Sequence, residues 1–277
     1  MSMVINTNMS ALSAQRNLAK TTNSLSTTYE RLTSGLRVNS AKDDAAGLSI
    51  SSRMTAQVRG INQSVRNAND AISMLQVAEG ALDETTNALQ RIRELAVQAS
   101  NESYTTSDRD SLQLEVNQLL SEIERIKADS TFNKMNLLDG TVTGKHMQVG
   151  AFSGQYVSVT VGSAGRSGLG VDLLVVSGTT FAKANSAITL VDAALNSVAD
   201  IRSNIGAMQN RFESIIANLS VMSERTTGAR SAIMDADVAE ETANLAKHSI
   251  LQQAGTAILA QANQQPQLAL SLLSSFR

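Results

Sequence analysis

Cysteine is absent from this chain of 277 residues, so disulfide bonds and thiolate metal sites are excluded. Tryptophan is also absent, proline occurs once, at Pro266, and aromatic residues make up only 3% of the sequence. A core poor in aromatic residues and rich in Ala, Leu, Ile and Val favours helix-on-helix packing over a β sandwich. We therefore expect a mainly α fold.

Neither sign of charge dominates, because the formal net charge is −2 and the acidic and basic residues are interspersed. The field of the whole chain consequently favours neither nucleic acid nor an anionic membrane. No window of about 18 consecutive apolar residues occurs, so no membrane-spanning helix is expected. The N-terminal segment lacks a basic region and a continuous apolar run, so it does not predict a Sec signal peptide.

The most regular pattern lies between residues 191 and 222, where apolar residues recur at alternating steps of three and four. This is a heptad seam, a narrow apolar stripe along one long helix, and it must pack against other helices to be stable. We predict that the helix begins near Ala182 and breaks after Met222. The predicted core positions are Val191, Val198, Ile205, Phe212 and Leu219, with companions at Ala194, Ile201, Met208, Ile215 and Met222.

Residues 10–34 carry a second seven-residue repeat, which predicts a helix that ends at Gly35. Its repeating positions are Ala11, Leu18, Leu25 and Leu32, with Thr22, Tyr29 and Leu36 as the expected alternate seam positions. A long helix should follow, with Ser40 as its N-cap and Asp43 in its first turn.

That long helix has apolar residues at strict seven-residue steps, and its companion series changes at Glu79. We interpret the change as a switch in the neighbour that the helix faces. A third helix is expected to be capped by Ser107, with Asp110 at the third position. The steps of the long helix are Met54, Ile61, Ala68, Leu75, Leu82, Leu89 and Ala96; the companions are Val58, Val65 and Ile72, then Ala78, Ile92 and Ala99.

The composition changes after Asp139 and Gly140, since nine of the sixteen glycines fall between Gly140 and Gly178. Val157, Val159 and Val161 alternate with polar residues, which predicts a half-buried strand, and residues 146–149 are its expected partner. The sequence thus predicts a small β-hairpin segment within residues 141–178. At the other end, residues 249–276 contain no Lys, Arg, Asp or Glu, which suits burial in an assembly.

Several long stretches closely resemble bacterial flagellins. They are INTN at residues 5–8, RLTSGLRVNSAKDDAAGLSISSRM at 31–54, QRIRELAVQAS at 90–100, FNKMNLLDG at 132–140 and QVGAFSGQ at 148–155. Near the C-terminus NRFESIIANL, MDADVAEETANLAKHSILQQAGTAILAQANQQPQ and the final LLSSFR do the same. The resemblance covers nearly the whole chain except residues 160–182, and it implies a short form that lacks the large variable surface domains.

The resemblance also implies a domain arrangement. Residues 1–40 and 234–277 would form paired inner helices, and residues 41–233 a helical-bundle rod with the β segment at about 141–178. The positions expected to serve filament assembly are Leu18, Leu25, Leu32, Ile250, Ile258, Leu268 and Leu272.

By the same resemblance the protein would be exported through the flagellar type III apparatus and polymerise into the extracellular filament used for swimming. Its implied partners are further copies of itself, the filament cap protein, the hook–filament junction protein and an export chaperone on the C-terminal helix. Toll-like receptor 5 of hosts is a further implied partner. The matching receptor motif falls on Leu89, Arg91 and Leu95, with Glu115 on the following helix, and the alternative interpretation is a charged packing face.

No catalytic, metal or cofactor site can be built from the sequence. His146 and His248 have no His or Cys neighbour at ligand spacing, and GTVTGKH at residues 140–146 is one residue short of a P-loop. The glycines at 162–170 do not have the spacing of a dinucleotide-binding fingerprint either. A structural subunit is therefore expected, and the alternatives are a hook–filament junction protein or a coiled-coil signalling module.

Overall fold

The computed structural model describes residues 7–275, with side chains described as far as Gln264. Five helices account for most of these residues: α1 (Met9–Ser34), α2 (Ala45–Ala99), α3 (Thr106–Asp129), α4 (Ala182–Met234) and α5 (Val238–Ser275). Between α3 and α4 lie four short strands: β1 (Thr131–Phe132), β2 (Met135–Asn136), β3 (Lys145–Gln148) and β4 (Tyr156–Val159). The expected mainly α fold with a small β-hairpin segment is confirmed.

The chain divides into two compact units. The terminal unit runs to Ala56 and resumes at Arg225, and the central unit is Gln57–Glu224. Both limits fall inside long helices, α2 and α4, because each helix contributes to both units. The predicted domain division at residues 40 and 234 falls instead between α1 and α2 and at the end of α4, and it stays a prediction.

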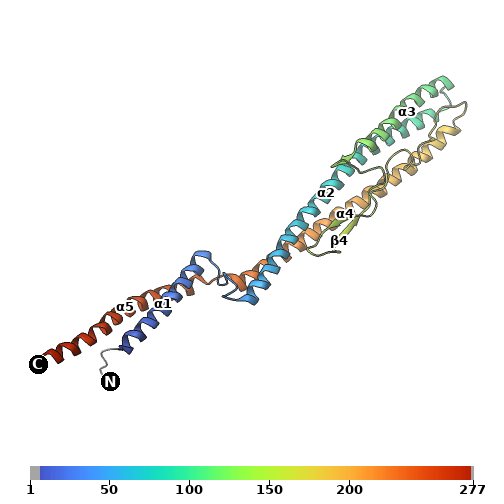
Figure 1. The fold of residues 1–277 in the computed structure, drawn as a ribbon. Coiled ribbons are helices and arrows are strands. Elements are labelled where there is room, and N and C mark those ends of the chain that lie inside the picture. The colour runs from blue at the N-terminus through green and yellow to red at the C-terminus, as the bar shows by residue number, and fades with distance from the viewer. Residues whose placement is uncertain (1–6, 276–277) are drawn as a thin grey trace. The chain divides into compact units, whose positions relative to one another are not determined.

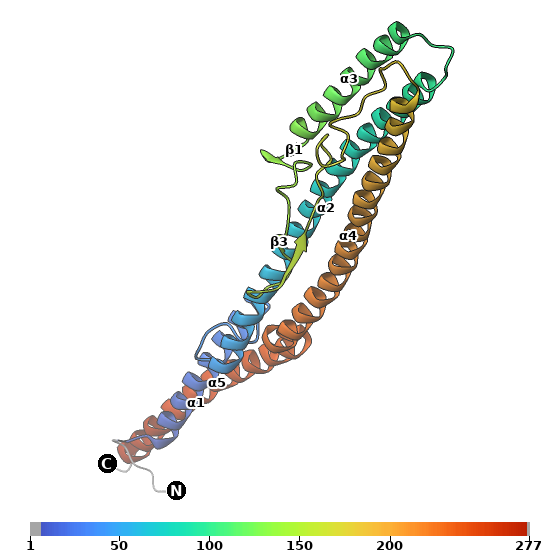
Figure 2. The ribbon, with the colours of Figure 1, turned by 90° about the vertical axis from the view of Figure 1, so that its right-hand side faces the viewer.

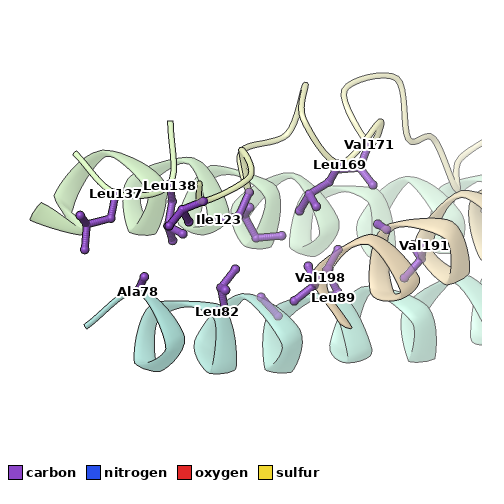
Figure 3. Packing of buried hydrophobic residues seen from close by; sticks show 14 of the residues in the cluster. Ala78, Leu82, Leu89, Ile123, Leu137, Leu138, Leu169, Val171, Val191 and Val198 are labelled. Atoms are coloured by element: carbon purple, nitrogen blue, oxygen red, sulfur yellow. The ribbon is translucent and has the colours of Figure 1, made fainter. Parts of the chain in front are cut away.

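In the central unit α2, α3 and α4 lie side by side, and the segment after β4 runs along them (Figures 1 and 2). Figure 3 shows how their apolar side chains meet: Leu82 of α2 approaches Ile123 of α3, and Leu89 of α2 lies beside Val198 of α4. One continuous hydrophobic cluster includes all of these residues. The central unit therefore has its own core.

The seam of α2 is more regular in the structure than the sequence suggested. From Ile61 onwards the seven-residue positions are buried, and the companion series is also buried without interruption. The predicted switch at Glu79 is wrong, because Ser64 and Ala71 hold the early companion positions and Val65 and Ile72 are only half-buried. A hydroxyl can occupy this place because Ser64 Oγ donates to the Gly60 carbonyl of its own helix.

Two predicted helix starts are also wrong. The Asp44 carboxylate accepts from the Gly47 N–H and begins α2, whereas Ser40 belongs to a turn in which Asp43 accepts from its backbone N–H. The cap of α3 is Thr105, and Asp108 completes a capping box with it. The S/T-x-x-D pattern occurs at both Thr105 and Ser107, so the sequence alone could not decide between them.

The expected break after Met222 does not occur either, since α4 continues to Met234. In contrast, the predicted strand pairing is confirmed, although β4 ends at Val159 and β3 at Gln148, so the predicted positions Val161 and Val149 lie outside the strands. β3 pairs antiparallel with β4, with Met147 opposite Val157, and Val157 and Val159 point into the core. β1 and β2 form a second hairpin, whose two turn residues Asn133 and Lys134 both have positive φ, as a type I′ turn requires.

Candidate assembly surfaces

The terminal unit is built on the antiparallel pair of α1 and α5, which lie side by side in Figures 1 and 2. Two polar contacts fix their register. Asn8, the N-cap of α1, donates from Nδ2 to the Ala262 carbonyl at 2.7 Å. At the other end of α1, Arg31 Nη1 lies 3.1 Å from Glu241 Oε1, and the Glu241 side chain is almost completely buried.

The contact between the two helices is close at its middle. A Cβ at Gly255 would lie 3.2 Å from Leu18 Cδ1, so glycine lets α5 approach the α1 side chain. Leu25 is buried at the same interface, and Leu18 and Leu32 are half-buried. The predicted seam positions Thr22 and Tyr29 are wrong, since both are exposed; Ala14, Thr21 and Thr28 take their place.

The inner face of α5 has a heptad spacing but few large apolar residues. Its heptad positions are Glu241, Leu245, His248, Gln252, Gly255, Leu259 and Ala262, all of them buried or half-buried. Small and polar side chains remove little apolar surface from water, so this interface contributes less hydrophobic stabilisation than a leucine-rich seam would. His248 Nδ1 is buried there without a hydrogen-bond partner among the described residues.

The outer face of α5 carries large apolar residues as well. Ile250 is 65% exposed and Ile258 is 58% exposed, and Val238 and Leu251 are exposed as well. Apolar side chains that repeat on one exposed face mark an interaction surface. Leu268 and Leu272 lie farther along α5, where side chains are outside the described residues.

The predicted seam of α4 lies in the central unit. Val191, Val198, Ile205, Phe212 and Leu219 are all buried there. The companion positions change gradually, because Ala194 is buried, the next three are half-buried and Met222 is exposed. The stripe therefore faces other helices along one edge and becomes accessible towards residue 222.

The charged residues of the receptor motif lie on the surface that α2 shares with α3. Arg91 makes ion pairs of 2.9 Å with both Glu94 and Glu115. The Arg91 guanidinium donates hydrogen bonds to Glu94 and Glu115, and these bonds, first the one to Glu94 and then the one to Glu115, raise the pKa of Arg91. All three side chains are about half-exposed, so the pairs contribute little to folding and remain accessible to a partner.

The apolar residues of the same motif have a different position. Leu89 and Leu95 are 0% and 1% exposed and belong to the core of the central unit. Their side chains cannot touch a partner that docks on the folded surface. Leu89 lies on the side of the helix roughly opposite Arg91, whereas Leu95, four residues after Arg91, is its neighbour on the helix surface but is buried in the core.

The structure also reveals two features that the sequence analysis missed. Arg109 is buried and donates to the carbonyls of Ala99, Asn101 and Gly178, so it holds the end of α2 to the chain before α4. The second feature is a groove beside the β3–β4 loop, with Phe152 and Tyr156 on its wall. Two aromatics within a glycine-rich stretch were the only signal for it in the sequence.

No group of three or more His, Asp or Glu side chains that could hold a metal ion occurs in the described part of the chain. The two histidines lie in different units: His146 stacks on Tyr156 with ring centroids 3.9 Å apart, and His248 lies against α1. Among residues 7–275 no helix combines the length and the apolar character that crossing a membrane requires.

These surfaces define a class of helical protein in which heptad-patterned helices form a core and present further apolar faces for packing. Comparison with known proteins is more specific. The model of the bacterial flagellin N-terminal helical region matches residues 5–143, and that of the C-terminal helical region matches residues 188–273. The chain therefore belongs to the bacterial flagellin family.

Individual relatives agree with this assignment. The chain is 47% identical over 271 residues to a flagellin of Halalkalibacterium halodurans, covering 98% of this chain and all of the relative. It is 44% identical over 285 residues to the flagellar filament 33 kDa core protein of Treponema phagedenis, covering 98% of this chain and 100% of that protein. A putative flagellar hook-associated protein from Vibrio parahaemolyticus has a similar fold, with a TM-score of 0.59, 16% identity, and coverage of 70% and 100%.

Proposed function

We propose that this protein is the structural subunit of a bacterial flagellar filament and that it assembles with copies of itself. The observation that carries the proposal is the arrangement of the α1–α5 pair, which buries small and polar residues and exposes Ile250 and Ile258. Exposed apolar residues along a charge-free stretch of helix are removed from water only when other helices cover them. Flagellin relatives of nearly the same length support the identity of that assembly.

On this proposal the C-terminal helix is required for assembly, but it is not required for folding of the central unit. We expect a chain that lacks residues 249–277 to keep its central core, because the buried seams lie between Ile61 and Leu219. The truncated chain should stay monomeric under seeded conditions in which the intact protein forms filaments, as seen by negative-stain microscopy. Filaments made of the truncated chain would contradict the proposal.

The same proposal includes the surroundings in which such a subunit works. We infer export through the flagellar type III apparatus, an extracellular location in the filament, and a role in swimming motility. The partners would be the filament cap protein, the hook–filament junction protein and an export chaperone that binds the C-terminal helix. The charge-free stretch from Ser249 onwards is the segment that would need such protection before assembly.

The alternatives are less well supported. A hook–filament junction protein would share the fold. However, this chain is only 16% identical to the putative hook-associated protein, whereas it is 47% identical to a flagellin over nearly its whole length. A coiled-coil signalling module has no need for an exposed apolar face on a charge-free helix. Filament formation by the purified chain distinguishes that alternative directly.

Recognition by Toll-like receptor 5 is a second proposed function, and it depends on Arg91 and Glu115. Both side chains are accessible, and a guanidinium can form paired hydrogen bonds that lysine does not reproduce. Arginine anchors at interfaces often cost about 2 kcal/mol or more when truncated, so Arg91→Ala should lower monomer potency more than tenfold in a receptor reporter assay. Full potency of Arg91→Ala would contradict the receptor proposal, and Arg125→Ala on α3 is a matched exposed control.

A further inference from the structure

The loop between β3 and β4 has a conformation that its own side chains hold. Gln148 Nε2 donates to the Gly150 carbonyl at 2.8 Å and to the Phe152 carbonyl at 2.7 Å. The Gln155 side chain then accepts from the Phe152 N–H at 3.1 Å. Because both amide side chains bind backbone, the loop keeps Phe152 in one place although this ring is 59% exposed.

The loop is also fixed to α2. Asn67 Nδ2 donates to the Gln148 carbonyl at 3.0 Å. Next to this bond the backbone of the loop reaches Gly60 of α2, where a Cβ would lie only 2.9 Å from the Ala151 Cβ. Any larger residue at position 60 would push the loop away, so glycine permits this docking.

The docked loop forms one side of a groove of about 640 Å³, which we call the central groove. Its lining is largely apolar, with two exposed aromatic rings and a guanidinium. Aromatic and arginine side chains are the residues most often found as anchors of protein interfaces. The residues that matter for the argument are Ile61, Phe152, Tyr156, Arg211, Ile215 and Leu219.

Arg211 shows which charge an occupant should carry. Some arginines of α2 and α4 already take part in ion pairs, such as Arg93 and Arg202, whose carboxylate partners lie at 2.7 and 2.8 Å. Arg211 lines the groove, and no ion pair is formed by it among the described residues. A segment with apolar side chains next to a carboxylate would complement this groove.

The central unit itself presents such a segment. Residues 172–175, which we call the tip strip, read Asp-Leu-Leu-Val, and Leu173 is 87% exposed while Val175 is also exposed. Leu174 and Val176 are buried beneath them. The Gln113 side chain accepts from the Val176 N–H at 2.6 Å, which holds the strip against α3.

We propose that the central groove of one subunit receives the tip strip of a second copy, with Leu173 between Phe152 and Tyr156. The carboxylate of Asp172 then faces Arg211. It can do so because the Asp172 side chain is half-exposed and its ion pair with Arg166 within its own subunit is long, at 3.6 Å. This inference rests on the proposed filament function and names a contact for it.

The positions of the two surfaces explain why this contact would build a polymer. Gln113 lies beside the strip, and Glu115, one half-turn farther along α3, pairs with Arg91 of α2. Arg91 is thirty residues from Ile61 of the groove, which is roughly 45 Å along a helix that rises about 1.5 Å per residue. Two complementary surfaces at different places on one molecule make a head-to-tail contact, which continues from copy to copy.

The absence of cysteine permits a direct test. Phe152→Cys and Leu173→Cys proteins, each carrying one thiol, are mixed, polymerised on wild-type seeds and treated with a short bismaleimide. We expect covalent dimers from the mixture and none from either variant alone, because the proposed contact always joins one groove to one strip. A mixture of Val77→Cys with Leu173→Cys is the matched control, since Val77 is an exposed residue of α2 outside the groove.

The outcomes separate this inference from the proposed function. Filaments in which the Phe152→Cys and Leu173→Cys mixture yields no more dimer than the control would overturn the groove assignment and leave the filament function standing. Dimers between Phe152→Cys and Ile258→Cys would also overturn it, because they would assign the groove to a neighbouring α5. Failure of the wild-type chain to form filaments would instead contradict the proposed function on which the inference rests.

A charge exchange covers the case in which thiol variants polymerise poorly. Arg211→Glu and Asp172→Arg should each raise the critical concentration for polymerisation about threefold, the size expected of a modest ion pair. Combining them should restore the wild-type value, since the pair is re-formed in the opposite sense. Two independent effects that simply multiply in the double variant would overturn the contact.

Discussion

The two units of this protein use the same seven-residue repeat for opposite purposes. In the central unit the repeat places Leu75, Leu82 and Leu89 in a buried core. In α5 of the terminal unit it places Glu241, His248 and Gln252 on the inner face and leaves Ile250 and Ile258 outside. A heptad pattern therefore predicts a helix and one face that contacts other helices. The residue types on that face determine whether its burial stabilises the monomer strongly, as in the central unit, or only weakly, as in α5.

The largest expected effect on thermal stability comes from changing isoleucine to aspartate, and the same change is made once in each unit. Ile205→Asp places a carboxylate in the core of the central unit, at a cost of roughly 1.5–3 kcal/mol for lost burial and several more for the unpaired charge. We expect the thermal transition followed by circular dichroism to fall steeply or disappear. Ile250→Asp is the matched control: it should leave that transition nearly unchanged and abolish polymerisation. Equal thermal losses in both variants would remove the distinction between the units.

The next effect concerns the buried arginine of the central unit. Arg109→Ala removes the guanidinium that donates hydrogen bonds to three backbone carbonyls. Leaving buried polar groups such as these carbonyls unpaired costs about 1–3 kcal/mol. We expect a loss of about that size in the free energy of unfolding, measured by urea denaturation. Arg125→Ala should cost within about 0.5 kcal/mol, because its ion pairs with Glu122 and Asp129 are exposed. A cost for Arg109→Ala no larger than that of Arg125→Ala would show that its carbonyl contacts do not stabilise the unit.

A third substitution should strengthen the weak interface of the terminal unit. In His248→Leu an apolar side chain of similar reach replaces an imidazole whose Nδ1 is buried without a hydrogen-bond partner among the residues that the structure describes. We expect the α1–α5 pair to gain about 1 kcal/mol, which limited proteolysis of the monomer would report as a several-fold slower cleavage within α5. His146→Leu in the β3 strand is the control and should not change that rate. Faster cleavage of His248→Leu would mean that the imidazole stabilises the pair.

The smallest expected effect is the dependence of the two units on acid. Hydrogen bonds from Ser40 lower the pKa of Asp43 in the terminal unit, and hydrogen bonds from Thr105 lower the pKa of Asp108 in the central unit. A carboxyl whose folded pKa lies below its unfolded value of about 3.9 stabilises the fold above that pH, and this contribution is lost as the pH falls through the folded pKa. Asp108→Asn should therefore flatten the acid limb of the unfolding curve of the central unit, and Asp43→Asn should not. An unchanged acid limb in Asp108→Asn would show that this cap does not couple to folding.

Much of this architecture could be predicted from the sequence, and the errors within the helix seams have a common physical cause. The helices and the β3–β4 pairing followed from periodicity and from turn residues. The errors fell on positions where small or hydroxyl residues occupy a seam, such as Ser64 in α2 and Thr28 in α1. An apolarity pattern does not register these residues, although a hydroxyl that bonds to its own helix is easily buried.

The candidate surfaces were harder to predict than the fold. Leu89 was already a predicted seam position of α2, which conflicted with its assignment as a receptor contact, whereas the burial of Leu95 became visible only in the structure. The central groove depends on the approach of Ala151 to Gly60, residues that lie 91 positions apart in the sequence and whose contact no local pattern reveals. In contrast, the charge-free C-terminal stretch was visible directly, since burial in an assembly was the simplest reason for its composition.

The central claim is that the outer face of α5 is an assembly surface, and amide hydrogen exchange of monomer and filament tests it most directly. In the monomer the central unit should be strongly protected, whereas amides around Ile250 to Ile258 should exchange quickly, because the inner face of α5 stabilises the helix only weakly. In the filament the same α5 amides should become protected by at least about a hundredfold, which corresponds to about 2.7 kcal/mol of added stability. Equal protection of α5 in the two states would contradict the account.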